Sequence, residues 1–303
     1  MKKLFFALCA VAALASCSKE EVVSYDKGEV IGFANPFVNK STRAAIDPSY
    51  SGDGTITGFK VWGTANDVAI YAGDDVAQSS GVWTCANPVN YWIEDTQYKF
   101  AAVANAKTVD CNSTDFPVTA TFDATAAANV DLVYAPIVSQ TGHAAGSNTA
   151  VPLVFNHLLS KVKFTVNVAD ASADNYSFVV RDITVKGAHT GTVTLATGVW
   201  SSLGEDTAYT DFDIVVGDTD DDVECAQELL LIPDEISISF EVDIKYNGET
   251  INTKPYGTSP LIKKTIVAGN AYNFIIGVSL GDPITFDVDY TLWDETGNTS
   301  NLN

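Results

Sequence analysis

Apolar and polar residues alternate with a period of two over several segments in the second half of the chain. The most regular of these segments are residues 161–168, 237–246, 272–278 and 284–292. Every second side chain of a strand lies on the same face, so each segment predicts a strand that buries one face and exposes the other. Asn247-Gly248 directly follows the second segment and is typical of a two-residue hairpin turn. These features favour antiparallel sheets packed face to face.

Shorter runs of strand-forming residues, separated by turn residues, predict further strands in the first half. They lie near residues 60–62, 69–71, 98–103, 118–122, 132–138 and 151–155. An earlier, shorter alternation places Ile31 and Phe33 on one face. The prediction is an all-β chain with two tandem antiparallel β-sandwich domains, residues 44–169 and residues 170–303.

The amino terminus has the pattern of a secretory signal. A basic start precedes an apolar stretch over residues 4–14, which is too short to span a bilayer. The stretch ends in the string L-A-S-C, which resembles a bacterial lipobox whose Cys17 becomes the lipidated first residue. This predicts a signal peptide over residues 1–16 and a lipoprotein that carries palmitate on Cys17. The alternative is an ordinary signal peptide followed by an unmodified Cys17.

The charge balance limits the classes of partner. The chain has 303 residues, 17 Lys and Arg against 38 Asp and Glu, and a formal net charge of −21. Nucleic-acid binding and adhesion to anionic lipid through a basic patch both need clustered cationic side chains. The composition therefore predicts no nucleic-acid partner, and the carboxylates are expected to keep an exported protein soluble.

No pattern of residues predicts catalysis, a cofactor or a metal site. His143, His157 and His189 are isolated, and the chain has no H-E-x-x-H, G-x-S-x-G or S-x-x-K motif. His157 is predicted to be packed and hydrogen-bonded at a domain interface. The three cysteines beyond Cys17, which are Cys85, Cys111 and Cys225, form no C-x-x-C pair. Buried free thiols are favoured over a Cys85–Cys111 disulfide.

Four segments carry a family resemblance. Residues 155–162 read F-N-H-L-L-S-K-V, and the others are L-L-L-I-P at 229–233, A-G-N-A-Y-N-F at 268–274 and a last strand at 284–293 that ends in Trp. In this order they resemble the fimbrillin family of the Bacteroidetes, the structural subunits of type V pili. The signature residues of the first segment are Phe155, His157, Ser160 and Lys161.

The resemblance implies a fold, a location and an assembly mechanism. The two sandwiches would be transthyretin-like, and the protein would be exported as a lipoprotein to the surface of the outer membrane. There an Arg-specific protease would cut between Arg43 and Ala44 and release residues 17–43, which hold the lipidated tether and the removable first strand. The last strand would then serve as the donor in β-strand exchange with other fimbrillin subunits, through Ile284, Phe286, Val288, Tyr290 and Leu292.

Two hypotheses of function follow. The first is a structural subunit of a fimbria, cleaved after Arg43 and polymerised by strand exchange for adhesion. The second is a monomeric, lipid-anchored surface adhesin or glycan-binding module, of the tip or anchor type, that is not cleaved. Exposed aromatic residues would favour the second hypothesis, and the candidates for a sugar platform are Trp62, Trp83, Tyr91 and Trp92. Their positions in predicted strands favour a core role instead.

Overall fold

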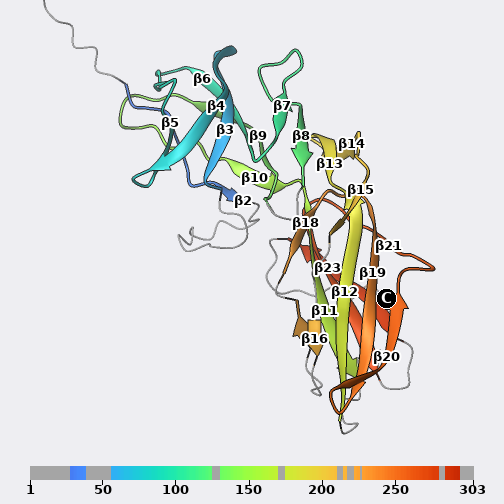
Figure 1. The fold of residues 1–303 in the computed structure, drawn as a ribbon. Helices are drawn as coiled ribbons and strands as arrows, with labels where there is room; N and C mark the ends of the chain where they lie inside the picture. Colours follow the sequence, from blue (N-terminus) through green and yellow to red (C-terminus); the bar gives the residue numbers. More distant parts are fainter. Residues whose placement is uncertain are drawn as a thin grey trace, which may run out of the picture.

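The computed structural model describes residues 28–38, 56–124, 130–169, 175–209, 214–216, 222–225, 227–279 and 284–293. Within these residues every regular element is a β-strand (Figure 1), so the predicted all-β class is confirmed. Most neighbouring strands are antiparallel, as predicted. Two pairs are parallel, namely β10 with β2 and β11 with β22.

The first sheet has eight strands in the order β1-β5-β4-β3-β6-β9-β10-β2. Their bounds are β1 Gly32–Phe33, β2 Phe37–Val38, β3 Gly58–Ala65, β4 Val68–Ser79, β5 Val82–Cys85, β6 Gln97–Ala104, β9 Val133–Thr141 and β10 Val154–His157. The edge strands β1 and β2 are neighbours in the sequence, so one short segment lies along both edges of the sheet. The sheet encloses the N-terminal core, which includes Ile31, Phe33, Phe59, Tyr71, Trp83, Trp92, Tyr98, Phe100 and Phe155.

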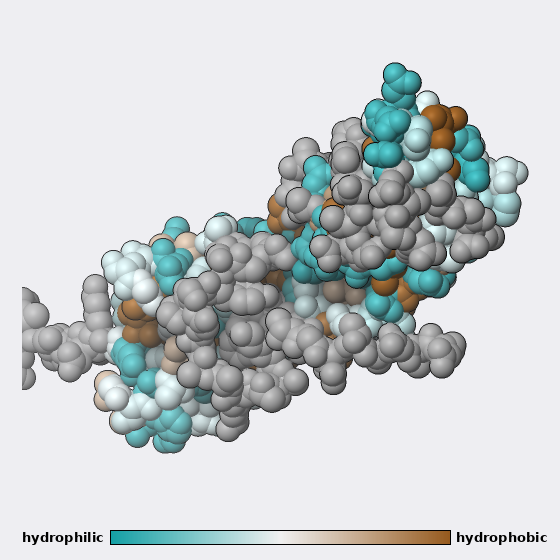
Figure 2. Space-filling model, turned by 90° about the horizontal axis from the view of Figure 1, so that it is seen from below, coloured by the Kyte–Doolittle hydropathy of each residue, from teal (hydrophilic) through white to brown (hydrophobic). Residues whose placement is uncertain are grey.

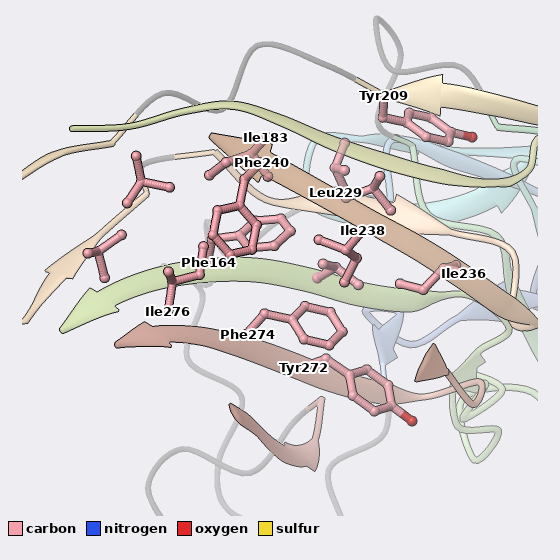
Figure 3. Close-up of a cluster of buried hydrophobic side chains, with 14 of the residues drawn as sticks. Phe164, Ile183, Tyr209, Leu229, Ile236, Ile238, Phe240, Tyr272, Phe274 and Ile276 are labelled. Carbon is pink, nitrogen blue, oxygen red and sulfur yellow. The ribbon is translucent and has the colours of Figure 1, made fainter. Parts of the chain in front are cut away.

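Two further sheets contribute the C-terminal core. One has the order β17-β11-β22-β23 with β18 also on β11, and the other has the order β15-β12-β19-β20 with β16 on β12 and β21 on β19. Their bounds are β11 Ser160–Ala169, β12 Tyr176–Ala188, β15 Asp206–Tyr209, β16 Ile214–Val216, β17 Val223–Glu224, β18 Leu229–Leu231, β19 Glu235–Tyr246, β20 Glu249–Tyr256, β21 Ile262–Thr265, β22 Asn270–Ser279 and β23 Thr285–Leu292. The alternations predicted over residues 161–168 and 237–246 place Phe164 and Phe240 inside this core (Figure 3).

A fourth sheet joins strands from the two halves of the sequence. Its order is β14-β13-β8-β7, with bounds β7 Thr108–Asp110, β8 Thr119–Asp123, β13 Thr190–Thr194 and β14 Val199–Ser201. Thr121 of β8 lies opposite Thr192 of β13. Under this sheet lies the junction core, whose buried members include Trp62, Val103, Phe122, Leu132, Leu158, Leu159, Val193, Leu195, Leu230 and Ile232.

The chain passes between the cores within a short segment. Phe155 belongs to the N-terminal core, Leu158 and Leu159 to the junction core, and Val162 to the C-terminal core. The boundary predicted between residues 169 and 170 falls after β11, which shares the C-terminal core with β12. The division into residues 44–169 and 170–303 stays a prediction.

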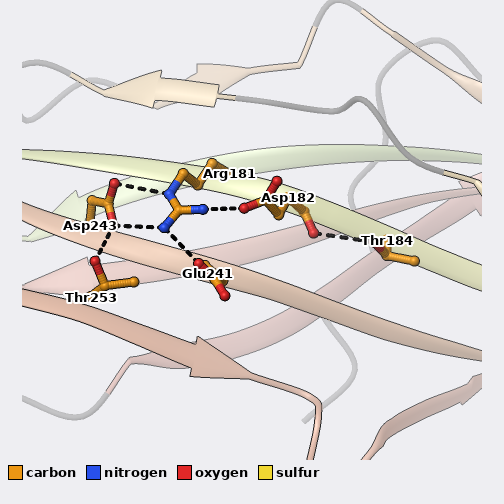
Figure 4. A network of polar contacts seen from close by, with 6 residues as sticks. All are labelled: Arg181, Asp182, Thr184, Glu241, Asp243 and Thr253. Carbon is orange, nitrogen blue, oxygen red and sulfur yellow. Dashed lines mark hydrogen bonds and ion pairs between the residues drawn. The ribbon is translucent and has the colours of Figure 1, made fainter.

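A polar network lies on the outer face of β12 and β19 (Figure 4). Arg181 Nε donates to Asp243 Oδ2 at 2.9 Å, and Thr253 Oγ1 donates to Asp243 Oδ1 at 2.5 Å. Arg181 also pairs with Glu241 at 2.6 Å and with its neighbour Asp182. The pKa of the Asp243 carboxyl lies below its ordinary value of 3.8, first because Arg181 donates to it and then because Thr253 does.

This lowered pKa predicts an acid-sensitive contribution to stability. The folded carboxylate resists protonation more than the unfolded one, so its contribution is complete above pH 3.8 and is lost as the pH falls below that value. We expect Asp243→Asn to lower the free energy of unfolding by about 1 kcal/mol at pH 7, and the difference from wild type to shrink towards pH 2. Urea unfolding across this range measures it, with Asp287→Asn on an exposed position of β23 as the control. A difference that stays constant down to pH 2 would contradict the assignment.

Candidate functional site

The N-terminal segment, defined as residues 28–38, inserts two apolar side chains into the N-terminal core. Ile31 is fully buried and Phe33 nearly so. The Phe33 ring lies 5.7 Å from that of Phe59 and 5.9 Å from that of Phe100, each edge to face. Such aromatic pairs add to the stabilisation that burial alone gives. The short alternation seen in the sequence therefore places two side chains in the core, Ile31 just before the edge strand β1 and Phe33 within it.

The backbone of the N-terminal segment is bonded on both sides. On one side the Ile31 amide donates to Asn90 O and the Trp92 amide donates to Glu29 O, at 2.9 and 2.8 Å. On the other side the Ala34 amide donates to Val151 O and the Val151 amide donates to Gly32 O, both at 2.9 Å. These bonds go to residues 90, 92 and 151, outside the strands, and add to the pairing of β1 with β5 and of β2 with β10.

A carboxylate fixes the start of the N-terminal segment to a distant loop. Glu29 Oε2 accepts hydrogen bonds from Asn148 Nδ2 at 3.0 Å and from the Gly146 amide at 3.0 Å. The pKa of Glu29 lies below its ordinary value, mainly because of the Asn148 side chain. The segment is therefore held by these polar contacts of Glu29 in addition to the apolar contacts of the buried Ile31 and Phe33.

Strand β23 forms the edge of its sheet. It pairs with β22, and no other described strand borders it. Of the five predicted donor residues, Ile284, Phe286 and Val288 pack against the C-terminal core, whereas Tyr290 and Leu292 are 39% and 57% exposed. The Phe286 ring lies 5.6 Å from that of Phe274. The apolar face therefore packs on the core over residues 284–288 and is more exposed towards the end of β23, where the Tyr290 ring still lies 5.7 Å from that of Tyr272.

The four signature residues lie where the cores meet. Phe155 is fully buried in the N-terminal core, and the buried Ser160 donates from Oγ to Val267 O at 2.8 Å. His157 Nδ1 lies 2.5 Å from Asp131 Oδ2, and both side chains are almost fully buried. Lys161 Nζ pairs with Glu228 Oε2 at 3.2 Å. The prediction of a packed, hydrogen-bonded His157 is confirmed.

The last described residue, Trp293, docks on this signature. Its ring stacks on the His157 imidazole, with centroids 3.8 Å apart and planes 2° from parallel. Lys161 Nζ lies 5.6 Å from the centroid of the same ring, within reach of a cation–π interaction. The Trp293 amide donates to Gly269 O at 2.9 Å. The end of β23 is therefore held at the junction between the cores.

A family model described as fimbrillin-like matches residues 42–293. The chain belongs to the fimbrillin-like family. The match covers most of the sequence, including the signature residues at the junction and the whole of β23. A search of curated proteins finds no match.

Solved structures share the fold of this fimbrillin-like chain. A fimbrial protein from Bacteroides vulgatus is similar with a TM-score of 0.63 and 14% identity, over 88% of this chain and 100% of that one. A candidate cell adhesion protein from Bacteroides ovatus gives a TM-score of 0.54 and 15% identity, over 89% of this chain and 99% of that one. At these identities the likeness concerns the fold.

The candidate sugar platform is not formed in the fimbrillin-like chain. Trp62, Trp83 and Trp92 are each at most 6% exposed and belong to the N-terminal or junction core. On the face shown in Figure 2, hydrophobic residues lie in small groups among hydrophilic ones. The core role that strand position favoured for these tryptophans is confirmed.

The remaining predicted sites are structural or lie outside the described residues. Cys85, Cys111 and Cys225 are free thiols, and burial raises the pKa of Cys85 and Cys111. The described parts of the chain contain no group of His, Cys, Asp or Glu that could hold a metal ion. No helix among them is long and apolar enough to cross a membrane. Cys17, Arg43 and Ala44 fall outside the described residues.

Sequence reasoning missed Asp131 and the contact between Trp293 and His157. Trp293 was noted only as the end of the last strand, and Asp131 stands beside a predicted strand without any motif. Their partners lie far away in the sequence, so no local pattern predicts these contacts. The family signature was the one available signal, because it contains both His157 and Lys161.

Proposed function

We propose that this protein is a structural subunit of a cell-surface fimbria, exported as a lipoprotein through Cys17, cleaved after Arg43 and polymerised by β-strand exchange for adhesion. The observation that carries the proposal is the placement of residues 28–38. They lie upstream of Arg43, belong to both edges of the first sheet and bury Ile31 and Phe33 in its core. Membership of the fimbrillin-like family supports the proposal.

Cleavage after Arg43 would allow the N-terminal segment to leave. Its departure would unpair one edge of β5 and one edge of β10, because β1 and β2 border them. It would also expose the apolar surface that Ile31 and Phe33 cover, each worth about 1.5–3 kcal/mol when fully buried. A strand added from another chain would pair with these open strand edges and fill the exposed apolar site.

The C-terminal strand offers a matching replacement. Ile284 and Phe286 repeat the residue types and the spacing of Ile31 and Phe33. A donor strand from a second subunit would therefore place Ile and Phe where the removed segment had them, and Val288 would extend the contact. The joint uses different surfaces on the two subunits, so repeated addition gives an open filament rather than a closed ring.

Location and partners follow from this mechanism. The uncleaved subunit would sit on the surface of the outer membrane through the lipid on Cys17, and the cleaved one in the fimbrium. Its partners would be an Arg-specific surface protease and other fimbrillin subunits, including anchor and tip subunits. The similarity to a fimbrial protein from Bacteroides vulgatus supports this role. We assign no catalytic residue, cofactor or metal.

The mature amino terminus tests the proposal. Material sheared from the cell surface is expected to begin at Ala44 and to migrate as a ladder of multimers that boiling converts to a monomer. Mass spectrometry of the amino terminus and electrophoresis with and without boiling measure both properties. A surface protein found only as a monomer that retains a lipidated Cys17 would overturn the proposal and support the uncleaved adhesin instead.

A further inference from the structure

Strand β23 is attached to its own subunit at two separate places. Its first half packs Ile284, Phe286 and Val288 on the C-terminal core. Its end is held by Trp293, which packs on the junction core, a different cluster. Between these attachments Leu292 is 57% exposed and Tyr290 is 39% exposed, with the Tyr290 ring 5.7 Å from that of the buried Tyr272. The outer edge of the strand has no described neighbour.

The Trp293 contact combines three interactions in one place. The indole stacks in parallel on His157, Lys161 approaches the same ring, and the Trp293 amide donates to Gly269 O. The imidazole is also held at its edge, since Nδ1 lies 2.5 Å from Asp131 Oδ2. Trp293 therefore docks on a buried, hydrogen-bonded platform. An edge strand otherwise opens readily from its end, because that end carries the fewest contacts.

We propose that Trp293 is a latch that keeps the donor strand folded on its own subunit until exchange begins. The inference rests on the proposed function in one respect only, namely that β23 is the strand that is donated. While Trp293 is docked, β23 stays paired with β22 and its apolar residues are withheld from other subunits. When the indole leaves His157, the more exposed end of β23 is free to separate from β22.

The latch predicts which parts of the molecule open together. Removing the indole is expected to free β23 while the rest of the C-terminal core stays closed, because Phe164, Phe240 and Phe274 belong to the C-terminal core whereas Trp293 packs on the junction core. A tryptophan with a purely structural role in the junction core would act differently. Its loss would loosen the strands around that core instead of β23.

Hydrogen exchange of the full chain, purified as a monomer and read by mass spectrometry, separates these cases. In Trp293→Ala we expect exchange of the β23 amides to rise about tenfold, equivalent to about 1.4 kcal/mol, with β11 and β19 unchanged. The matched control is Trp200→Ala, because Trp200 packs on the same junction core and donates from Nε1 to Leu158 O at 2.9 Å. That variant is expected to affect β13 and β14 but not β23. Trp293→Phe, which keeps a ring on His157, is expected to fall between wild type and Trp293→Ala.

Two results would overturn the latch. One is unchanged exchange of β23 in Trp293→Ala, and the other is an equal rise throughout the C-terminal core. With cleaved subunits, the latch also predicts faster growth of the multimer ladder in Trp293→Ala. If wild-type subunits form no ladder although β23 opens in Trp293→Ala, Trp293 still holds β23 closed on its own subunit, and it is the proposed function that fails. If ladders form and β23 exchange is unaffected by the substitution, the proposed function stands and the latch fails.

Discussion

A chain that carries Arg43→Ala is expected to remain an uncleaved monomer that accepts no donor strand. Without the cut, residues 28–38 stay covalently linked to the sheet that they border, so a displaced segment rebinds its own site. Short tethers give effective concentrations in the millimolar range, far above the concentration of free subunits on a cell. A donor with the same Ile-x-Phe pattern makes similar contacts, and the additional contact of Val288 is not expected to offset this difference in concentration.

Two further variants separate the effect of losing the cleavage site from the effect of losing the positive charge of Arg43. Arg43→Lys keeps the positive charge but removes the site for an Arg-specific protease, and we expect it to behave like Arg43→Ala. Adding Thr42→Arg to Arg43→Ala supplies an Arg one residue earlier and is expected to restore both cleavage and the ladder. Immunoblots of unboiled surface fractions and amino-terminal mass spectrometry read the outcome. Wild-type ladders from Arg43→Ala subunits that keep residues 17–43 would show that cleavage is not required.

The period-two alternation predicted the strands of the C-terminal core well. Residues 161–168 and 237–246 became β11 and β19 with the expected residues inside. What alternation cannot predict is which strands become neighbours, because it fixes the buried face of a strand and not its partner. The parallel pairing of β11 with β22 was therefore not predicted. The pairing of β8 with β13, which crosses the predicted boundary, was missed for the same reason.

The features of the candidate site that depend on local sequence pattern were predictable, and those that depend on tertiary contacts were not. The Ile31 and Phe33 alternation correctly indicated a strand with one apolar face. The regular alternation over residues 284–292 suggested five equivalent inward positions, yet Tyr290 and Leu292 are exposed. They lie towards the end of β23, where the C-terminal core covers the strand less, although the Tyr290 ring still lies 5.7 Å from that of the core residue Tyr272. The docking of Trp293 depends on where β23 ends relative to His157.

The second large effect is expected at Asp131. Its carboxylate meets His157 at 2.5 Å with both side chains almost fully buried. Asp131→Ala would leave the imidazole without this partner in a buried place, which costs about 3 kcal/mol of the free energy of unfolding. Asp131→Asn keeps a side-chain acceptor for the imidazole N–H and is expected to cost clearly less.

Urea unfolding of the full chain at pH 7 measures these losses. The matched control is Asp123→Ala, because Asp123 forms an exposed pair with Lys107 at 3.2 Å and such surface pairs contribute at most about 1 kcal/mol. Because His157 also carries the Trp293 ring, Asp131→Ala should additionally speed hydrogen exchange in β23, whereas Asp123→Ala should not. If Asp131→Ala costs no more than the control, the buried pair does not stabilise the junction, and the platform under Trp293 must be fixed by packing alone.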